Sequence, residues 1–260
     1  MQLNLTGKRA LVCGASQGIG KACAQELALL GCDVTILARH ESTLAPALAN
    51  LSGPGRHHTL AVDLTQINQL RSTIDESMQI HGPFHILINN AGGPPGGPIT
   101  EAKPEDFIRA FEMHILANHT LAQLVIPGMK SNQFGRIINI ISTSVKIPLP
   151  GLGVSNTIRG AVANWAKTMA GELASFGITV NNVLPGATET ERLAGIIRTK
   201  AQKAGTSEDE MALHMRQEIP ARRFGKPEEI AAMVAFLASP AASYVNGTSI
   251  AVDGGRTGCH

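Results

Sequence analysis

The stretch Gly14-Ala15-Ser16-Gln17-Gly18-Ile19-Gly20 decides the fold, because it joins a short apolar run at residues 10–12 to a helical pattern. Glycines in such a turn let the backbone approach a ligand closely, and the following helix presents unpaired N–H groups and a positive dipole end to a phosphate. The glycine spacing is G-x3-G-x-G, which differs from the G-x-G-x-x-G of the standard dinucleotide fingerprint. Taken alone, the turn is consistent with nucleotide binding or with packing only.

Short apolar runs alternate with helical stretches along the rest of the chain, and each run is followed by a polar residue or a glycine. The runs lie at residues 10–12, 34–37, 60–62, 86–88, 137–141, 179–183 and 249–252. This alternation is typical of βαβ units in a parallel sheet. We therefore predict an α/β fold, a doubly wound, Rossmann-like parallel sheet of about seven strands with helices on both faces. Ligands bind such sheets at the carboxyl ends of the strands.

The whole chain, residues 1–260, is expected to form a single dinucleotide-binding domain. Its length suits one large α/β unit, and no repeat, linker or low-complexity tract divides it. Apolar residues recur at three- and four-residue steps over residues 154–176, which predicts a helix packed on the core. Residues 189–217 are charged and helical in composition, and we interpret them as a lid over the substrate.

Composition and charge exclude several classes of protein. The chain is 43% hydrophobic and only 16% charged, which argues against disorder. Its 22 Lys and Arg residues nearly balance 20 Asp and Glu residues, whereas nucleic acids and membrane surfaces require a basic face. No apolar run is long enough to span a membrane, and the first nine residues lack a secretory leader's apolar stretch.

The four cysteines are Cys13, Cys23, Cys32 and Cys259, and they form neither a C-x-x-C pair nor a paired zinc spacing. We therefore expect no metal site, and we interpret the cysteines as buried or free thiols of a reducing compartment. Together with the absence of a leader pattern, this predicts a cytoplasmic location.

Arg39 follows the second predicted strand, at the position that distinguishes the two nicotinamide dinucleotides. A cofactor with a free 2′-hydroxyl favours an acidic residue at this strand end, whereas a 2′-phosphate favours a guanidinium group. Here the sequence is Leu37-Ala38-Arg39, with no acid. A guanidinium can bind a phosphate through two hydrogen bonds, so a bound dinucleotide is expected to be NADP(H). The alternative is that Arg39 is an ordinary solvated surface arginine.

Motifs spread over residues 5–256 resemble those of the short-chain dehydrogenase/reductase family, single-domain type. The shared motifs are Cys13-Gly14-x3-Gly18-Ile19-Gly20 (with Cys13 where Thr is usual), Asp63-Leu64, Asn89-Asn90-Ala91-Gly92, Pro185-Gly186-Ala187-Thr188-Glu189-Thr190, Arg222-Arg223-Phe224-Gly225-x-Pro227-Glu228-Glu229 and Ile250-x-Val252-Asp253-Gly254-Gly255. The resemblance implies an oxidoreductase that is a homotetramer. The cofactor-binding residues that it implies, together with Arg39, are Gly14, Ser16, Gln17, Gly18, Ile19, Gly20, Asp63, Leu64, Asn90, Ala91, Gly92, Arg159, Pro185, Gly186, Thr188 and Thr190.

The chain departs from the family at the positions where the resemblance implies catalysis. The family has a serine at the end of the fifth strand, and Ser142 matches it. The tyrosine and lysine of the family's Y-x3-K motif fall on Ser155 and Arg159, and the family's helix asparagine falls on His114. The only tyrosine, Tyr244, cannot align with the missing one. Three of the four catalytic positions therefore carry different residues.

The replacements change the proton chemistry that this site can perform. In the usual site an ammonium lowers the pKa of a phenol from about 10 until it exchanges a proton near neutrality. A serine hydroxyl such as that of Ser155 titrates far above this range. Arg159 stays charged, so it can bind ribose hydroxyls or a substrate carboxylate but cannot relay protons.

His114 is the nearby side chain whose ordinary pKa, about 6.5, allows proton exchange at neutral pH. Our hypothesis is that His114 acts as general acid or base, directly or through water, while Ser142 and Ser155 orient a carbonyl oxygen. The alternative is that His114 is a packed, hydrogen-bonded helix residue. Lys146 is either a solvated loop residue or a further group reaching the pocket.

Three functions remain consistent with the sequence. The first is an NADP(H)-dependent oxidoreductase with an atypical site, acting on a small carbonyl or alcohol, because the cofactor carries the hard chemistry. The second is a non-redox enzyme on the same scaffold, such as an isomerase, a hydratase or a deaminating enzyme, in which Arg159 anchors an anionic small-molecule substrate. The third is a catalytically silent NADP(H)-binding protein. The fold alone cannot choose among them.

Overall fold

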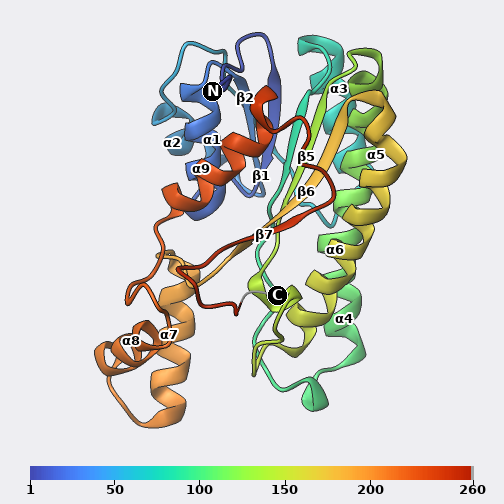
Figure 1. Cartoon of the computed structure of the whole chain (residues 1–260). Coiled ribbons are helices and arrows are strands. Elements are labelled where there is room, and N and C mark those ends of the chain that lie inside the picture. Colours follow the sequence, from blue (N-terminus) through green and yellow to red (C-terminus); the bar gives the residue numbers. More distant parts are fainter. Residues whose placement is uncertain (259–260) are drawn as a thin grey trace.

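A seven-stranded parallel sheet forms the centre of the molecule in the computed structural model, which describes residues 1–258 (Figure 1). Its strands are β1 (Arg9–Cys13), β2 (Asp33–Ala38), β3 (His58–Ala61), β4 (Ile86–Asn89), β5 (Gly135–Ile140), β6 (Ile178–Pro185) and β7 (Ser249–Val252). They lie in the order β3-β2-β1-β4-β5-β6-β7, and every neighbouring pair is parallel. The predicted fold and all seven predicted strands are confirmed, with strand ends that differ by at most two residues.

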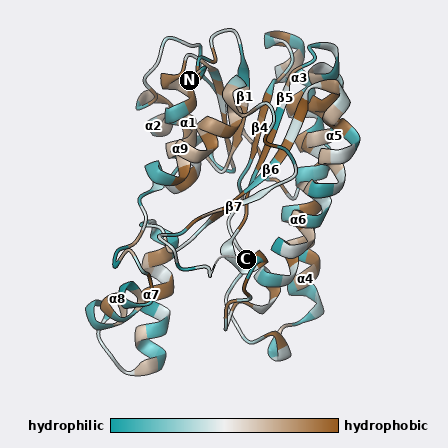
Figure 2. Cartoon of the chain, in the orientation of Figure 1, coloured by the Kyte–Doolittle hydropathy of each residue, from teal (hydrophilic) through white to brown (hydrophobic). Residues whose placement is uncertain are grey.

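Helices cover both faces of the sheet, because successive strand side chains point to opposite sides. Leu11 faces one apolar core and its neighbour Val12 faces the other. The helices α1 (Gly18–Leu29), α2 (Glu41–Ala49) and α9 (Pro227–Ala238) enclose the core that contains Val12. The opposite core is enclosed by α3 (Ile67–His81), α5 (Ala117–Ser131) and α6 (Gly153–Leu173). Figure 2 shows hydrophobic residues concentrated in the strands between these layers.

Shorter elements complete the fold. They are η1 (Ile99–Glu101), α4 (Pro104–Phe111), the π-helical turn η2 (Glu112–Leu116), η3 (Thr143–Val145), η4 (Ala174–Phe176) and η5 (Pro240–Ala242). Of these, η4 and η5 lie at the amino side of the following strands, β6 and β7. The helix predicted over residues 154–176 is confirmed as α6, which continues into η4.

A chain of buried amides links four strands on the side of α5 and α6. Asn89, Asn139, Asn182 and Ser249 occupy paired register positions on β4, β5, β6 and β7. The side chain of Asn89 donates to Asn139 at 2.8 Å, Asn139 donates to Asn182 at 2.9 Å, and Asn182 donates to Ser249 at 3.1 Å. Hydrogen bonding offsets the cost of burying polar groups, so this chain favours alignment of the strand ends next to the site.

The helices α7 (Glu191–Ala204) and α8 (Glu208–Gln217) project beyond the carboxyl ends of the strands (Figure 1). They confirm the helical structure predicted for residues 189–217. The two helices pack through an apolar cluster of their own, formed by Leu193, Ile197, Met215, Ile219 and Phe224. This cluster makes the helix pair a compact unit beside the carboxyl ends of the strands, which form the rim of the sheet.

No helix within residues 1–258 is both long and apolar enough to cross a membrane. Cys13, Cys23 and Cys32 are buried free thiols, as expected. Cys259 lies outside the described residues.

Candidate active site

The glycine turn after β1 adopts a conformation that its sequence requires. Gly14 and Gly18 have φ values of +58° and +54°, in the left-handed region that favours glycine. Gly20 lies in the first turn of α1, where a Cβ atom would approach the carbonyl oxygen of Gly14 to 2.2 Å. The three glycines therefore bring the start of α1 directly onto the end of β1.

Asn90 fixes the end of β4 against this turn. Its side-chain Nδ2 donates to the carbonyls of Cys13 and Gly14, both at 3.2 Å. A Cβ atom on Gly14 would lie 2.6 Å from the carbonyl oxygen of Asn90, so the close approach of the two segments also depends on glycine. The structure thus brings the predicted residues of β1 and β4 together.

The predicted residues at the start of α1 are placed for contact with a ligand. Gln17 is the N-cap of α1 and makes no side-chain capping hydrogen bond, so the first N–H groups of the helix are not satisfied by a side chain. Gln17 is exposed, and Ser16 and Ile19 are partly buried beside it. Arg39 is exposed directly after β2, the neighbour of β1 in the sheet.

Asp63 and Leu64 follow β3, at the carboxyl ends of the strands like the residues above. One carboxylate oxygen of Asp63, Oδ1, accepts hydrogen bonds from the backbone N–H and the hydroxyl of Thr65, both at 2.9 Å. Leu64 packs against the core on the side of α3. The backbone here is therefore held in a turn that leaves Asp63 partly accessible.

The segment from Pro185 to Thr190 connects β6 to α7 and approaches the glycine turn. A Cβ atom on Gly186 would lie 2.7 Å from Cα of Asp253, so this residue packs tightly on the segment after β7. The hydroxyl of Thr188 donates to the carbonyl of Gly186, and the hydroxyl of Thr190 caps α7 by accepting from the N–H of Leu193. The Thr190 methyl lies 3.3 Å from the Cβ position of Gly18, so the predicted cofactor residues of β6 and β1 meet.

Ser142 and Ser155 come from two neighbouring elements. The hydroxyl of Ser142, directly after β5 and Ile141, accepts a hydrogen bond of 3.1 Å from the N–H of Ser144. Ser155 is buried in the first turn of α6, one helical turn before Arg159 and on the same face. Lys146 is exposed. Tyr244 is fully exposed and precedes β7, at the amino ends of the strands and away from the rim.

Arg159 is buried and binds the backbone ends of two strands. One guanidinium nitrogen, Nη1, donates to the carbonyl of Ile140 at 2.8 Å, and Nη2 donates to the carbonyl of Ala91 at 3.5 Å. Its Nε has no hydrogen-bond partner among the described residues. Burial, and secondarily the charge of Arg192, lower the pKa of Arg159 to about 10, so the group remains a cation at neutral pH.

His114 lies in the π-helical turn η2 and is only 2% exposed. π-Helical turns within α-helices are frequently found at functional sites. Burial, followed by the charge of Arg159, lowers the pKa of His114 to about 3, although a hydrogen bond to the backbone of Gly92 acts in the opposite direction. The expectation that His114 titrates near neutrality is therefore wrong, because desolvation and neighbouring cations disfavour the imidazolium. Its Nε2 has no partner within residues 1–258.

Arg192 is a residue of the site that sequence reasoning missed. From the first turn of α7, its Nη1 donates to the carbonyl of Gly93 at 2.9 Å and its Nη2 donates to that of Pro94 at 3.4 Å. A Cβ atom on Gly93 would lie 2.3 Å from Nη2, so glycine provides the space. The only sequence signal was the proximity of Arg192 to Thr190, because an arginine on a polar helix is usually a solvated residue.

Three cationic or imidazole side chains thus bind consecutive residues of the segment after β4. Arg159 contacts Ala91, His114 contacts Gly92 and Arg192 contacts Gly93. None of the ion pairs among the described residues includes Arg159 or Arg192. The site therefore combines hydroxyl groups with an uncompensated positive charge.

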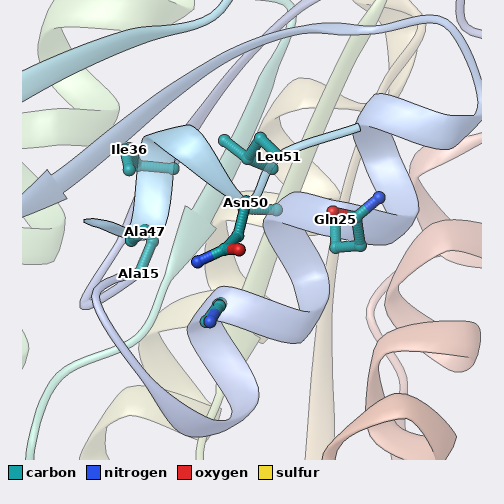
Figure 3. Close-up of a pocket in the computed structure, with 8 residues that line it drawn as sticks. Ala15, Gln25, Ile36, Ala47, Asn50 and Leu51 are labelled. Atoms are coloured by element: carbon teal, nitrogen blue, oxygen red, sulfur yellow. The ribbon is translucent and has the colours of Figure 1, made fainter. Parts of the chain in front are cut away.

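A small hollow between α1 and α2 lies away from this cluster (Figure 3). Its lining includes Ala15, Gln25, Ile36 and Asn50, and its volume is about 10 Å³. That is room for about one water molecule, so the hollow is not a nucleotide site.

Comparison with known proteins agrees with this geometry. Residues 14–257 match the family model described as enoyl-(acyl carrier protein) reductase. The chain is 36% identical to the 3-oxoacyl-[acyl-carrier-protein] reductase of Vibrio cholerae (97% of this chain, 98% of the relative), and 32% identical to the gluconate 5-dehydrogenase of Gluconobacter oxydans (98% and 96%). The crystal structure of L-sorbose reductase from Gluconobacter frateurii, complexed with NADPH and L-sorbose, superposes with a TM-score of 0.94 at 29% identity, covering 100% of both chains.

The family-model match and these relatives extend over nearly the whole chain, including the glycine turn and the segment that follows β6. The chain belongs to the short-chain dehydrogenase/reductase family, and it is an oxidoreductase of that family.

Proposed function

We propose that the chain is an NADP(H)-dependent oxidoreductase that interconverts a small ketone or aldehyde and the corresponding alcohol at an atypical active site. The observation that carries the proposal is the glycine cradle after β1, with an exposed guanidinium on the neighbouring strand end. Gly14 and Gly20 let the turn pack directly against Asn90 and the start of α1, where a Cβ atom would collide with backbone carbonyl oxygens. Arg39 supplies a cation at the end of β2, where a 2′-phosphate is expected.

The residues present fit this cofactor. The first turn of α1, behind Ser16, Gln17 and Ile19, offers N–H groups to the pyrophosphate. Arg39 binds the 2′-phosphate, and Asp63 and Leu64 border the adenine. The remaining residues assigned to the cofactor surround its nicotinamide half: Asn90, Ala91, Gly92, Arg159, Pro185, Gly186, Thr188 and Thr190. The NADPH in the L-sorbose reductase complex supports this assignment.

The chemistry divides between the cofactor and the side chains. When bound, the nicotinamide donates or accepts the hydride. Ser142 and Ser155 bind the carbonyl oxygen through their hydroxyl groups. Arg159 holds the ends of β4 and β5 and provides a fixed positive charge, but it exchanges no proton. His114 is neutral at working pH and acts through hydrogen bonding, so the proton reaches the substrate oxygen through water.

Because three catalytic positions are altered, the test must also distinguish two alternative functions. A non-redox reaction on this scaffold would use Arg159 to anchor an anion, and a silent protein would bind NADP(H) without turnover. The decisive experiment combines calorimetry with NADPH and NADH and an assay of a panel of ketones and alcohols. We expect NADPH binding, together with a substrate-dependent loss of the near-ultraviolet absorbance of the reduced nicotinamide.

Each outcome of that experiment has one meaning. Turnover without a change in nicotinamide redox state identifies a non-redox enzyme. Nucleotide binding without any turnover identifies a silent binding protein. No heat of association with either dinucleotide, on folded protein, contradicts the proposal as a whole.

We further propose that the protein is a homotetramer, which an exposed apolar stripe supports. Ile108, Phe111 and Leu116 on α4 and η2 are between 40% and 58% exposed, which is unusual for large apolar side chains grouped on one segment. The single-domain organisation, the lid function of residues 189–217 and the cytoplasmic location stay predictions.

A further inference from the structure

Arg192 links α7 to the segment after β4 by hydrogen bonds from its guanidinium group to the backbone. A guanidinium carries five N–H donors, and Arg192 uses one on Gly93 and one on Pro94. Arg192 is exposed as a residue, although burial of its guanidinium lowers its pKa. Arg192 can therefore receive a further acceptor while it keeps its present position.

The surroundings of Arg192 call for a negative partner. The buried Nε of Arg159 in the same cluster has no hydrogen-bond partner within residues 1–258, and Arg159 is only 8% exposed. The charged groups that act on His114 are Arg159 and Arg192, and both are cations. Two guanidinium groups near a partly desolvated site repel each other unless an anion lies between them.

We propose that Arg192 selects a substrate that carries a carboxylate, which it binds beside Gly93, while the charge of Arg159, bonded to the nearby Ala91, adds to the attraction. The proposal rests on the proposed oxidoreductase function and adds the substrate class to it. A planar guanidinium binds a carboxylate through two parallel hydrogen bonds, and this geometry distinguishes Arg from Lys. The substrate is then a keto acid or its hydroxy acid.

The test compares pairs of compounds that differ only in the carboxylate. Gluconate and sorbitol are six-carbon polyols that differ at one terminal carbon, as do glycerate and glycerol at three carbons. All four are already alcohols, so with NADPH they form complexes without turnover, and calorimetry measures their binding directly. The titrations are repeated without nucleotide, so that the subsite is tested even where nucleotide binding fails.

The variants separate the charge of Arg192 from a general effect on α7. Arg192→Gln removes the charge, and Arg192→Lys keeps the charge but not the paired geometry. The control is Arg198→Gln, on the same helix, because Arg198 is exposed and pairs with Glu208 at 3.3 Å. NADPH affinity is measured for every variant.

We expect at least one carboxylate of the panel to bind the protein about tenfold tighter than its alcohol partner. This preference disappears in Arg192→Gln, is reduced in Arg192→Lys and persists in Arg198→Gln, while NADPH affinity stays within about twofold. A protein that prefers no carboxylate, or a preference that survives in Arg192→Gln, overturns the proposal. Loss of NADPH affinity without loss of carboxylate preference also overturns it, because Arg192 then binds the cofactor's phosphates.

Discussion

Arg159 and Arg192 bind the carbonyls of Ala91 and Gly93, so guanidinium groups from two helices hold the same short segment. One arginine comes from α6 and the other from α7. A backbone carbonyl carries only a partial negative charge, and it therefore compensates a guanidinium incompletely. This arrangement gives the site its shape and its positive charge together.

Replacing Arg39 tests the phosphate assignment. We expect Arg39→Asp to weaken NADPH binding at least tenfold, about 1.4 kcal/mol, because the 2′-phosphate loses a cation and meets a carboxylate. NADH, which lacks this phosphate, should bind no more weakly than to the unchanged protein. Arg56→Asp is the matched control, since Arg56 is also exposed but precedes β3 at the opposite edge of the sheet. Equal NADPH affinities of the Arg39 variant and the unchanged protein, measured by calorimetry, would refute the assignment.

Adding one methyl group at Gly93 tests the position of Arg192. In Gly93→Ala the new Cβ atom would lie 2.3 Å from Nη2 of Arg192, and the flexible arginine should move rather than the backbone. We expect the carboxylate preference to fall as it does in Arg192→Gln, while the free energy of unfolding changes by less than about 1 kcal/mol. Gly97→Ala is the control, because no atom lies within 4 Å of its Cβ position. Urea denaturation and the same binding titrations measure both effects, and an unaltered preference in Gly93→Ala would count against the role of this contact.

The buried state of His114 predicts how stability depends on pH. Its pKa is about 3 in the folded protein and about 6.5 in an unfolded chain, so only the unfolded chain binds the proton between these values. The stabilising contribution is therefore complete above pH 6.5 and is lost as the pH falls towards 3. We expect His114→Asn to reduce the slope of unfolding free energy against pH by up to about 1.4 kcal/mol per unit below pH 6.

The measurement is urea denaturation of both proteins at several pH values. Other histidines with lowered pKa, such as His57 and His85, are present in both proteins and cancel in the difference. Parallel slopes would show that His114 is not buried as a neutral group. The activity profile between pH 6 and 8 should keep its shape in the variant, and loss of an inflection near pH 6.5 would restore His114 as a titrating catalyst.

Restoring the family residues tests whether the altered positions limit proton transfer. In the double variant Ser155→Tyr with Arg159→Lys, a phenol and an ammonium return to one helix face, four residues apart. We expect the rate of ketone reduction to rise by about a hundredfold, the lower range for general acid catalysis. Arg159→Lys alone provides no phenol and should not gain activity. An inactive but folded double variant would mean that the surrounding pocket has changed as well.

Charge substitutions on the apolar stripe test the tetramer. Phe111→Glu and Leu116→Glu place carboxylates on a surface that we expect to be covered in the assembly, where an unpaired charge is costly. Sedimentation should show that both variants dissociate to smaller species. Leu213→Glu is the control, because Leu213 is 52% exposed on α8. If both stripe variants kept the oligomeric state of the unchanged protein, the interface would lie elsewhere.

The sequence predicted the sheet well, because short apolar runs ending at polar residues have few other interpretations. It also placed Gly14, Gly18 and Gly20 at a turn, where their close contacts now explain them. It failed on properties that depend on tertiary burial. The ordinary pKa of His114 was a poor guide because its burial against two cations cannot be read from a helix sequence.

Long-range contacts set a second limit. Arg192 meets Gly93 across 99 residues of sequence, and neither residue lies in a motif whose spacing links them. The direction of Arg159 was also not predictable, because its position on α6 is equally consistent with contact to a ribose or to the carbonyl of Ile140. The motifs thus located the rim, while the contacts that tune its charge emerged only from the fold.

The amide chain across β4, β5, β6 and β7 has a consequence for how the protein folds. If β5 slipped by one residue during assembly, Ile138 or Ile140 would replace Asn139, and the amides of Asn89 and Asn182 would be buried without their partner. Each such orphan costs about 1–3 kcal/mol, so a misregistered sheet is less stable than the native one. The buried side chains thereby select the correct strand register, and sequence changes in the surface loops do not alter this selection.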